Sequence, residues 1–130
     1  MGNDFIPGDV EEFIRKRIDS VAQLEALLLT RSDPEAEWSV GMLAKRLYTS
    51  EVQAIESVEA LYSDGLLIRR AGPPVLYQYQ PGSIELRELV DRVAEAYTKH
   101  LVPITNLIHS KPKTRVQEFA DAFRWRKEES

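Results

Sequence analysis

Four cationic side chains stand in two adjacent pairs, Lys45-Arg46 and Arg69-Arg70, and the segment between the pairs contains no Lys or Arg. Ammonium and guanidinium groups both bind phosphate oxygens, and a guanidinium can do so with two parallel donors. The alternative interpretation is that these cations only solvate a surface with acidic neighbours. The two pairs therefore mark a candidate anion-binding surface. The side chains of the segment between the pairs indicate which kind of anion this surface could bind.

A helix that begins at Ser50 is predicted for this segment. We expect its large apolar residues on the buried side, namely Ile55, Val58, Leu61 and Tyr62. Gln53 and Ser57 then point outward beside Glu56 and Ala60. An amide can pair with adenine, and a hydroxyl can contact several bases, so two outward side chains have the chemistry to read base edges. The acidic residues Glu51, Glu56 and Glu59 have the wrong sign for an approach to phosphates.

Catalytic and metal-binding residues are not indicated. The two histidines, His100 and His109, are nine residues apart, which places them on opposite sides of an ideal helix, and Pro103 lies between them. The carboxylate pairs lie at helix starts, in loops or in the tail, where a solvated surface explains them. Neither a Gly-rich phosphate loop nor a nucleophile elbow is present. We expect no enzyme, no metal and no cofactor.

Composition indicates one domain with an appendage. The chain has 130 residues, 43% of them hydrophobic, and a net charge of −4, the wrong overall sign for a protein held mainly by phosphate contacts. Acidic groups dominate the first 60 residues, and basic groups outnumber them only after residue 110. Cysteine is absent, and the sequence has neither a leader-like start nor an apolar run long enough to span a membrane. We expect a cytoplasmic protein without membrane contact.

Helix caps and turn signals order the first two thirds of the chain. Asp9 can cap a helix whose apolar spacing continues until Asp33-Pro34, and the pattern leaves open whether residues 9–31 form one helix or two that meet near Asp19-Ser20. Trp38 is expected in a short strand, and Ser39 caps the next helix. Ser50 and Gln53 form a capping box for the helix between the cation pairs, and Gly65 ends it.

Two short runs rich in β-formers follow, residues 66–68 and 75–79, and Ala71-Gly72-Pro73-Pro74 between them predicts a hairpin. The order helix, strand, helix, turn, helix, hairpin resembles the winged helix-turn-helix superfamily of bacterial transcription regulators over about residues 20–80. The match is carried by Ser50 through Gly65-Leu66-Leu67, which correspond to the recognition helix and its exit into the wing. The resemblance implies DNA contacts from a set of six candidates: Lys45, Arg46, Gln53, Ser57, Arg69 and Arg70.

The last third carries one long apolar seam that is interrupted by Pro103. The spacing predicts a helix over residues 83–110, about 42 Å long at ~1.5 Å per residue and kinked between Lys99 and Pro103. Its apolar residues are Leu86, Leu89, Val90, Val93, Tyr97, Leu101, Ile104 and Ile108. This seam is wider than one small domain can cover, so we expect a homodimer or a partner protein to bury part of it.

A final short helix is predicted from the capping box of Thr114 and Gln117, with Val116, Phe119 and Phe123 on one face. It could dock on its own chain or on a dimer mate, and its Lys and Arg residues with Trp125 could instead suit an acidic or phosphate-rich partner. The expected architecture is mainly α with a small β-hairpin. Residues 1–19 form an N-terminal arm and helix, residues 20–82 the winged helix, and residues 83–130 the long and terminal helices used for dimerisation or partner binding.

Three functions fit these observations. The resemblance implies a dimeric regulator that binds double-stranded DNA through the helix from Ser50 and the Arg69-Arg70 wing. The acidic helix and the long seam are instead typical of a winged helix used as a protein adaptor. A third reading is a small-molecule sensor with its pocket where the long helix crosses the wing, near Tyr77, Tyr79 and Tyr97.

Overall fold

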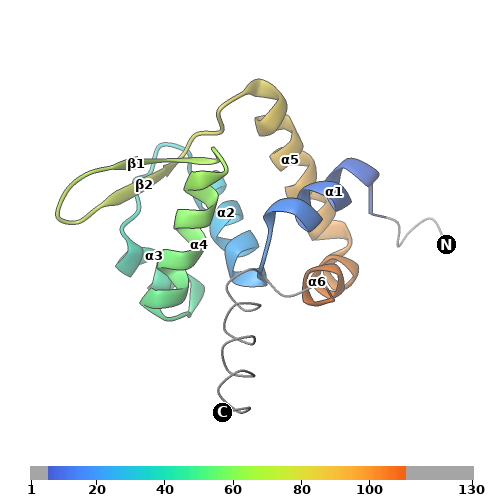
Figure 1. The fold of residues 1–130 in the computed structure, drawn as a ribbon, viewed down its shortest axis with the longest axis horizontal. Coiled ribbons are helices and arrows are strands. Elements are labelled where there is room, and N and C mark those ends of the chain that lie inside the picture. Colours follow the sequence, from blue (N-terminus) through green and yellow to red (C-terminus); the bar gives the residue numbers. More distant parts are fainter. Residues whose placement is uncertain (1–5, 111–130) are drawn as a thin grey trace, which may run out of the picture.

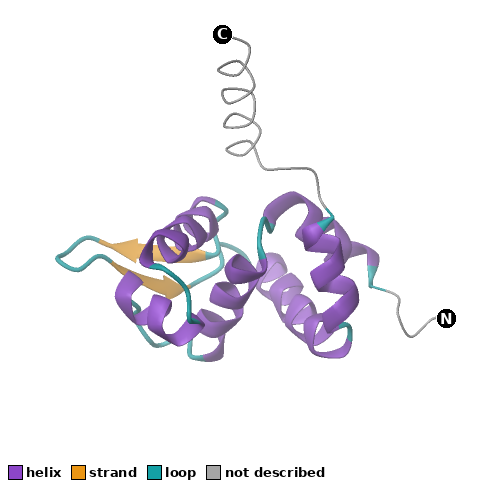
Figure 2. Ribbon diagram, turned by 90° about the horizontal axis from the view of Figure 1, so that it is seen from below, coloured by secondary structure: helices purple, strands orange, loops and turns teal. Residues whose placement is uncertain are grey.

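A computed structural model describes residues 6–110 of the chain. Within them the elements run α1 Gly8–Arg17, α2 Val21–Ser32, α3 Val40–Leu47, α4 Glu51–Ser63, β1 Leu67–Arg70, β2 Leu76–Tyr79, α5 Ile84–Lys99 and α6 Leu101–His109 (Figure 1). The hairpin lies at one end of the molecule beside α3 and α4, and α1, α5 and α6 gather at the other end. Figure 2 shows the same division from below. The expected mainly α architecture with one small hairpin is confirmed for the described residues.

Serine side chains start four of the helices. In each case the hydroxyl oxygen accepts the backbone N–H of the third residue along, which satisfies one of the amides that a helix start leaves unpaired. The cap and donor pairs are Ser20 with Gln23, Ser39 with Met42, Ser50 with Gln53, and Ser83 with Leu86. The caps expected at Ser39 and Ser50 are confirmed. Ser20 also settles the question left open for residues 9–31, which form two helices.

The wing is a two-stranded antiparallel ribbon with a third, very short partner. Leu67 pairs with Tyr79 and Arg70 pairs with Leu76, so the register is fixed along the whole hairpin. Trp38 forms an isolated antiparallel bridge with Tyr77, which confirms the short strand expected there. Gly65 has φ +77°, the left-handed conformation that favours glycine, and this turn carries the chain from α4 into the wing.

The helix expected over residues 83–110 is wrong as a single kinked element. His100 has φ −132° and ψ 49°, outside the helical region, and separates α5 from α6. Its amide donates to the Ala96 carbonyl at 2.7 Å, and its carbonyl accepts the Ile104 amide at 3.0 Å. Pro103 therefore lies in the first turn of α6, where an amide has no acceptor within the helix and proline is tolerated. The break lies between Lys99 and Pro103, as predicted, but it separates two helices instead of kinking one.

The apolar seam is covered mostly by the chain's own N-terminal helix, which corrects the main argument for a second subunit. Helix α1 packs against α5 and α6 through Val10, Phe13 and Ile14, all buried. Arg92 and Asp9 add an ion pair of 2.7 Å between α5 and the start of α1. Four of the eight seam residues are consequently buried within one chain: Val90, Val93, Ile104 and Ile108. The predicted terminal helix with Thr114, Val116, Phe119, Phe123 and Trp125 lies outside the described residues.

Helix α2 connects the two ends of the molecule. It packs against α4, α3 and the hairpin, and its polar edge reaches α5. Arg31 pairs with Asp91 at 2.9 Å, and the Tyr97 hydroxyl donates to the Glu25 carboxylate at 2.8 Å. Arg87 of α5 also places its guanidinium 5.7 Å from the centre of the Tyr79 ring in β2, so the winged end is tied to α5 both through α2 and directly.

Candidate nucleic-acid interface

Helix α4 is rolled about its axis relative to the expected orientation. Its buried residues are Ala54, Ser57, Val58 and Leu61. Ile55 is 46% exposed, although we expected it in the core, and Ser57 is only 5% exposed, although we expected it at the surface. The small side chains face inward because α4 packs closely against both α2 and α3. Ser57 therefore cannot reach a groove, and we remove it from the candidate contacts.

The exposed side of α4 is acidic and apolar. Glu51, Val52, Gln53, Ile55 and Glu56 are exposed, and the helix contains no Lys or Arg. Gln53, the candidate for adenine recognition, is on this side as expected, and its side-chain oxygen accepts a hydrogen bond from the Thr49 hydroxyl. Its amide nitrogen points away from that bond and can still donate to a base. Shape and one amide suit a groove here, whereas the charge of the helix does not.

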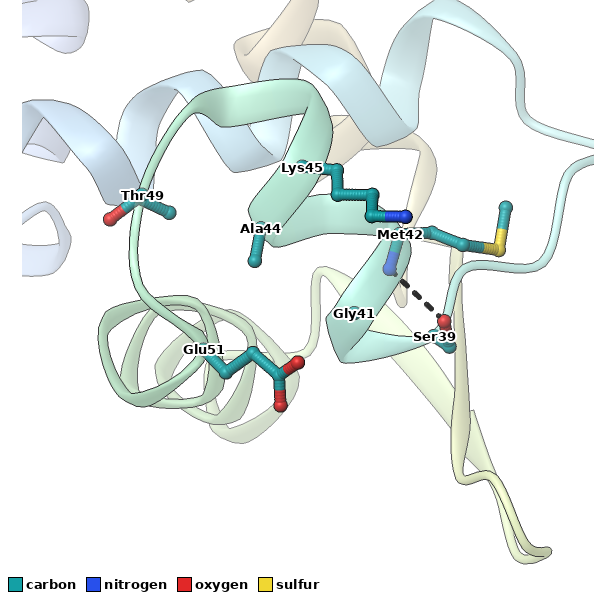
Figure 3. Close-up of a pocket in the computed structure, with 7 residues that line it drawn as sticks. All are labelled: Ser39, Gly41, Met42, Ala44, Lys45, Thr49 and Glu51. Atoms are coloured by element: carbon teal, nitrogen blue, oxygen red, sulfur yellow. Dashed lines mark hydrogen bonds between the residues drawn. The ribbon is translucent and has the colours of Figure 1, made fainter.

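A pocket of about 540 Å³ opens between the starts of α3 and α4. Figure 3 shows Lys45 and Glu51 entering it from the two helices, and its other lining residues are Ser39, Gly41, Met42, Ala44 and Thr49. Glu51 closely approaches the first turn of α3, where a Cβ on Gly41 would lie 3.8 Å from its carboxylate oxygen. The pocket is lined by a carboxylate as well as by the Lys45 side chain, so it is not a simple anion site.

The two wing arginines lie on opposite faces of the ribbon, because side chains alternate along a strand. Arg69 is on the face of Tyr77 and Trp38, and Arg70 is on the other. Both are already paired with acids: Arg69 Nη1 lies 2.9 Å from the Glu59 carboxylate, and Arg70 Nε lies 2.5 Å from that of Glu37. They do not form the single cationic cluster that their adjacency in sequence suggested.

The two cations of α3 differ from those of the wing. Arg46 places its guanidinium 5.4 Å from the centre of the Trp38 ring. Lys45 has no ion pair or ring contact with any residue between 6 and 110 and is exposed. The structure thus brings Arg46, Trp38, Tyr77 and Arg69 into one row across the winged end, with Lys45 and Gln53 nearby on α3 and α4.

Comparison with solved structures identifies this arrangement. A MarR family transcriptional regulator from Streptomyces coelicolor, Sco5413, aligns with a TM-score of 0.54 and 22% identity over 70% of this chain and 63% of that protein. A MarR family protein from Bacillus stearothermophilus aligns at 0.51 and 19% identity over 92% of this chain and 81% of its own. The multiple antibiotic-resistance repressor MarR from Listeria monocytogenes aligns at 0.51 and 22% identity over 93% of this chain and 78% of its own.

The chain has the winged helix-turn-helix fold. Helices α3 and α4 with the turn between them form the helix-turn-helix, and β1 and β2 form the wing. The chain spans less than two thirds of the Streptomyces protein. No protein-family profile and no curated protein sequence matches this chain.

One acidic residue, Glu59, organises the winged face, and the sequence alone identifies it only as a charge unfavourable to phosphates. Glu59 accepts hydrogen bonds from the Tyr77 hydroxyl and from Arg69. The Tyr77 bond, and then the Arg69 bond, hold the pKa of the Glu59 carboxyl below its usual value. Burial and the same carboxylate raise the pKa of Tyr77 to about 12. Glu59 is therefore ionised and Tyr77 neutral near pH 7, and the cation of the wing faces a fixed anion.

The two histidines and the three tyrosines of the sensor hypothesis are not brought together in the described residues. His100 lies at the junction of α5 and α6 and His109 at the end of α6, and residues 6–110 contain no group of three metal-ligating side chains. The three tyrosines of the sensor hypothesis have separate surroundings: Tyr77 bonds Glu59, Tyr97 bonds Glu25, and the buried Tyr79 hydroxyl has no hydrogen-bond partner among residues 6–110. No helix in this part of the chain is long and apolar enough to cross a membrane.

Proposed function

We propose that this chain is a dimeric winged-helix transcription regulator of the cytoplasm that binds double-stranded DNA through the N-terminal half of α4 and the wing. The observation that carries the proposal is the exposed face of α4 beside the hairpin, in a fold shared with a Streptomyces coelicolor protein described as a transcriptional regulator. Gln53 would contact a base edge, and Lys45, Arg46, Arg69 and Arg70 would contact the backbone. Lys45, which has neither an acidic nor an aromatic partner among residues 6–110, would make the strongest phosphate contact.

The dimer is proposed from the apolar residues that α1 leaves uncovered. Leu101 and Val102, in the first turn of α6, are 52% and 64% exposed, and Ile84 at the start of α5 is also exposed. Leu86, Leu89 and Tyr97, which belong to α5, are only partly buried. A second copy that covers these residues would carry a second winged end, and two linked weak contacts would reinforce each other on one duplex. Sedimentation equilibrium tests this, since a monomer at tens of micromolar contradicts it.

A salt titration of duplex binding tests the DNA proposal. Retardation of a duplex at 50 mM salt should fall steeply as salt rises, because each phosphate contact releases counterions. Lys45→Ala should weaken binding of every sequence, whereas Gln53→Ala should weaken it in a sequence-dependent manner. Arg15→Ala is the matched control, since Arg15 is an exposed cation of α1 at the other end of the molecule. Equal effects of Lys45→Ala and Arg15→Ala contradict the proposed surface.

A protein adaptor is the second candidate function, and the exposed side of α4 favours it. Val52 is 67% exposed and lies between Glu51 and Ile55 on a helix without cations, which suits a basic and apolar partner. The variant Glu56→Lys separates the two functions. It should strengthen duplex binding by a regulator, because it removes a repulsive charge and adds an attractive one, and it should abolish capture of a basic partner by an adaptor.

A further inference from the structure

The wing contains a small binding site for an oxyanion, and the carboxylate of an acidic residue of the same chain occupies it. Arg69 Nη1 lies 2.9 Å from both carboxylate oxygens of Glu59, and the Tyr77 hydroxyl donates to the same carboxylate. The guanidinium is stacked 4.2 Å from the centre of the Tyr62 ring. Two donors from neighbouring strands and one aromatic surface thus converge on a single acceptor group from α4.

The positions of these donors are fixed by the fold. Arg69 and Tyr77 are directly paired in the register of β1 and β2, so their side chains leave the same face of the ribbon. Tyr77 is buried and is also bridged to Trp38. Removal of the carboxylate would therefore leave both donors in place, and a phosphate oxygen, which takes the same kind of hydrogen bond, could accept from both.

We infer that the Glu59 carboxylate occupies a phosphate site of the wing, and that duplex binding exchanges this carboxylate for a phosphate of the DNA backbone. The inference rests on the proposed DNA-binding function. It adds that a carboxylate of the protein competes with the DNA phosphate for the same donors. The exchange is accessible from solvent, since the Arg69 and Glu59 side chains are 39% and 40% exposed. Glu59 thereby sets the affinity of the wing for DNA. While the Glu59 carboxylate is bound to Arg69, the charge of Arg69 is neutralised, and an approaching phosphate is repelled by the carboxylate.

The full-length chain tests this with one substitution and a matched control. Glu59→Gln keeps the shape of the side chain and removes its charge, and Glu56→Gln makes the same change on an exposed residue of the same helix. Both variants lose one negative charge near the DNA, so general repulsion falls by a similar amount in each. Glu59→Gln should bind a duplex roughly two- to fivefold more tightly than Glu56→Gln, the range expected for release of one exposed ion pair.

Two further measurements identify the cause of that difference. The salt dependence of Glu59→Gln should be steeper than that of Glu56→Gln by about one phosphate contact, a slope change of about 0.9 in log K against log salt. The extra affinity should disappear when Arg69→Ala is combined with Glu59→Gln. Circular dichroism and thermal unfolding of each variant check that the fold is retained.

The outcomes separate this inference from the proposed function. If the unaltered chain retards duplex and the two glutamine variants bind equally well, DNA binding stands and the exchange at Glu59 is wrong. The exchange is equally wrong if the extra affinity survives without Arg69. If neither the unaltered chain nor Glu59→Gln binds duplex at 50 mM salt, the proposed function itself fails and the inference with it.

Discussion

Trp38 and Tyr77 exchange both of their backbone hydrogen bonds, each at 2.8 Å. This bridge ties the residue just before α3 to the second strand of the wing. Because directly paired residues share a face of a sheet, Trp38, Tyr77 and Arg69 form one row, and Arg46 extends it by stacking on Trp38. The wing and the helix-turn-helix are therefore joined by direct contacts, and a change in the row should affect both stability and binding.

Tyr77→Phe should destabilise the protein. The substitution removes the hydroxyl that donates to Glu59 and leaves the ring in its buried place. A hydrogen bond to a charged group contributes more than a neutral one, but the Glu59 side chain is 40% exposed and water can replace the lost donor. We expect the free energy of unfolding, measured by urea denaturation, to fall by about 1 kcal/mol. An unchanged midpoint would show that the contact contributes nothing.

Tyr79→Phe, two residues along the same strand, should have the opposite sign. The Tyr79 hydroxyl is buried and has no hydrogen-bond partner in the part of the chain that the structure describes, so the folded state bears the cost of removing it from water. Replacing tyrosine by phenylalanine relieves that cost and keeps the packing of the ring. The free energy of unfolding should stay the same or rise by up to about 1 kcal/mol. A loss of stability equal to that of Tyr77→Phe would contradict the assignment of an unpaired hydroxyl.

Acid should weaken the Glu59 contacts in a defined window. The pKa of Glu59 is lowered from its ordinary value of 4.5, first by the Tyr77 hydrogen bond and then by Arg69. For a carboxyl whose folded pKa is depressed, the stabilising contribution is complete above the unfolded pKa and is lost as pH falls through the lower folded pKa. A ¹³C NMR titration should place the Glu59 midpoint below 4.5, and Tyr77→Phe should move it upward. A midpoint that is the same in both proteins would exclude the hydrogen bond as the cause.

The local signals of the sequence predicted the local structure well. The caps at Ser39 and Ser50, the turn at Gly65 and the hairpin all depend on residues within a few positions of one another, and the structure confirms each. The roll of α4 was mispredicted because hydrophobic periodicity assigns the largest apolar side chains to the core. Close packing between helices instead selects the small residues Ala54 and Ser57 and leaves Ile55 outside.

Contacts between distant segments could not be predicted in this way. The seam of α5 and α6 looks too wide for one domain in the sequence because its cover, α1, lies far earlier in the chain; Asp9 and Arg92, which form an ion pair, are 83 residues apart. The pairing of Glu59 with Arg69 depends on the reversal between α4 and β1, which no periodicity encodes. The sequence therefore predicts the region of the candidate site. The pairing of Arg69 with Glu59 and of Arg70 with Glu37 depends on the tertiary fold.

The cap of α4 should have a measurable value. The Ser50 hydroxyl accepts the Gln53 amide at 3.1 Å, and Ser50→Ala leaves that amide without its partner. Loss of such a cap costs about 1 kcal/mol. Ser63→Ala, at the exposed far end of the same helix, is the control and should change the free energy of unfolding by less than about 0.5 kcal/mol. Equal effects in the two variants would argue against capping as the source of the loss.

Pro103→Ala tests whether α5 and α6 are two helices or one. In the middle of a continuous helix, proline costs about 3 kcal/mol, so its replacement by alanine would stabilise the protein by a comparable amount. In the first turn of α6, the residue-103 amide has no acceptor within the helix, and the same replacement should change the free energy of unfolding by less than about 1 kcal/mol. The break would persist, because the conformation of His100 and the packing of α6 on α1 hold it. A large stabilisation with increased helicity by circular dichroism would favour the single kinked helix.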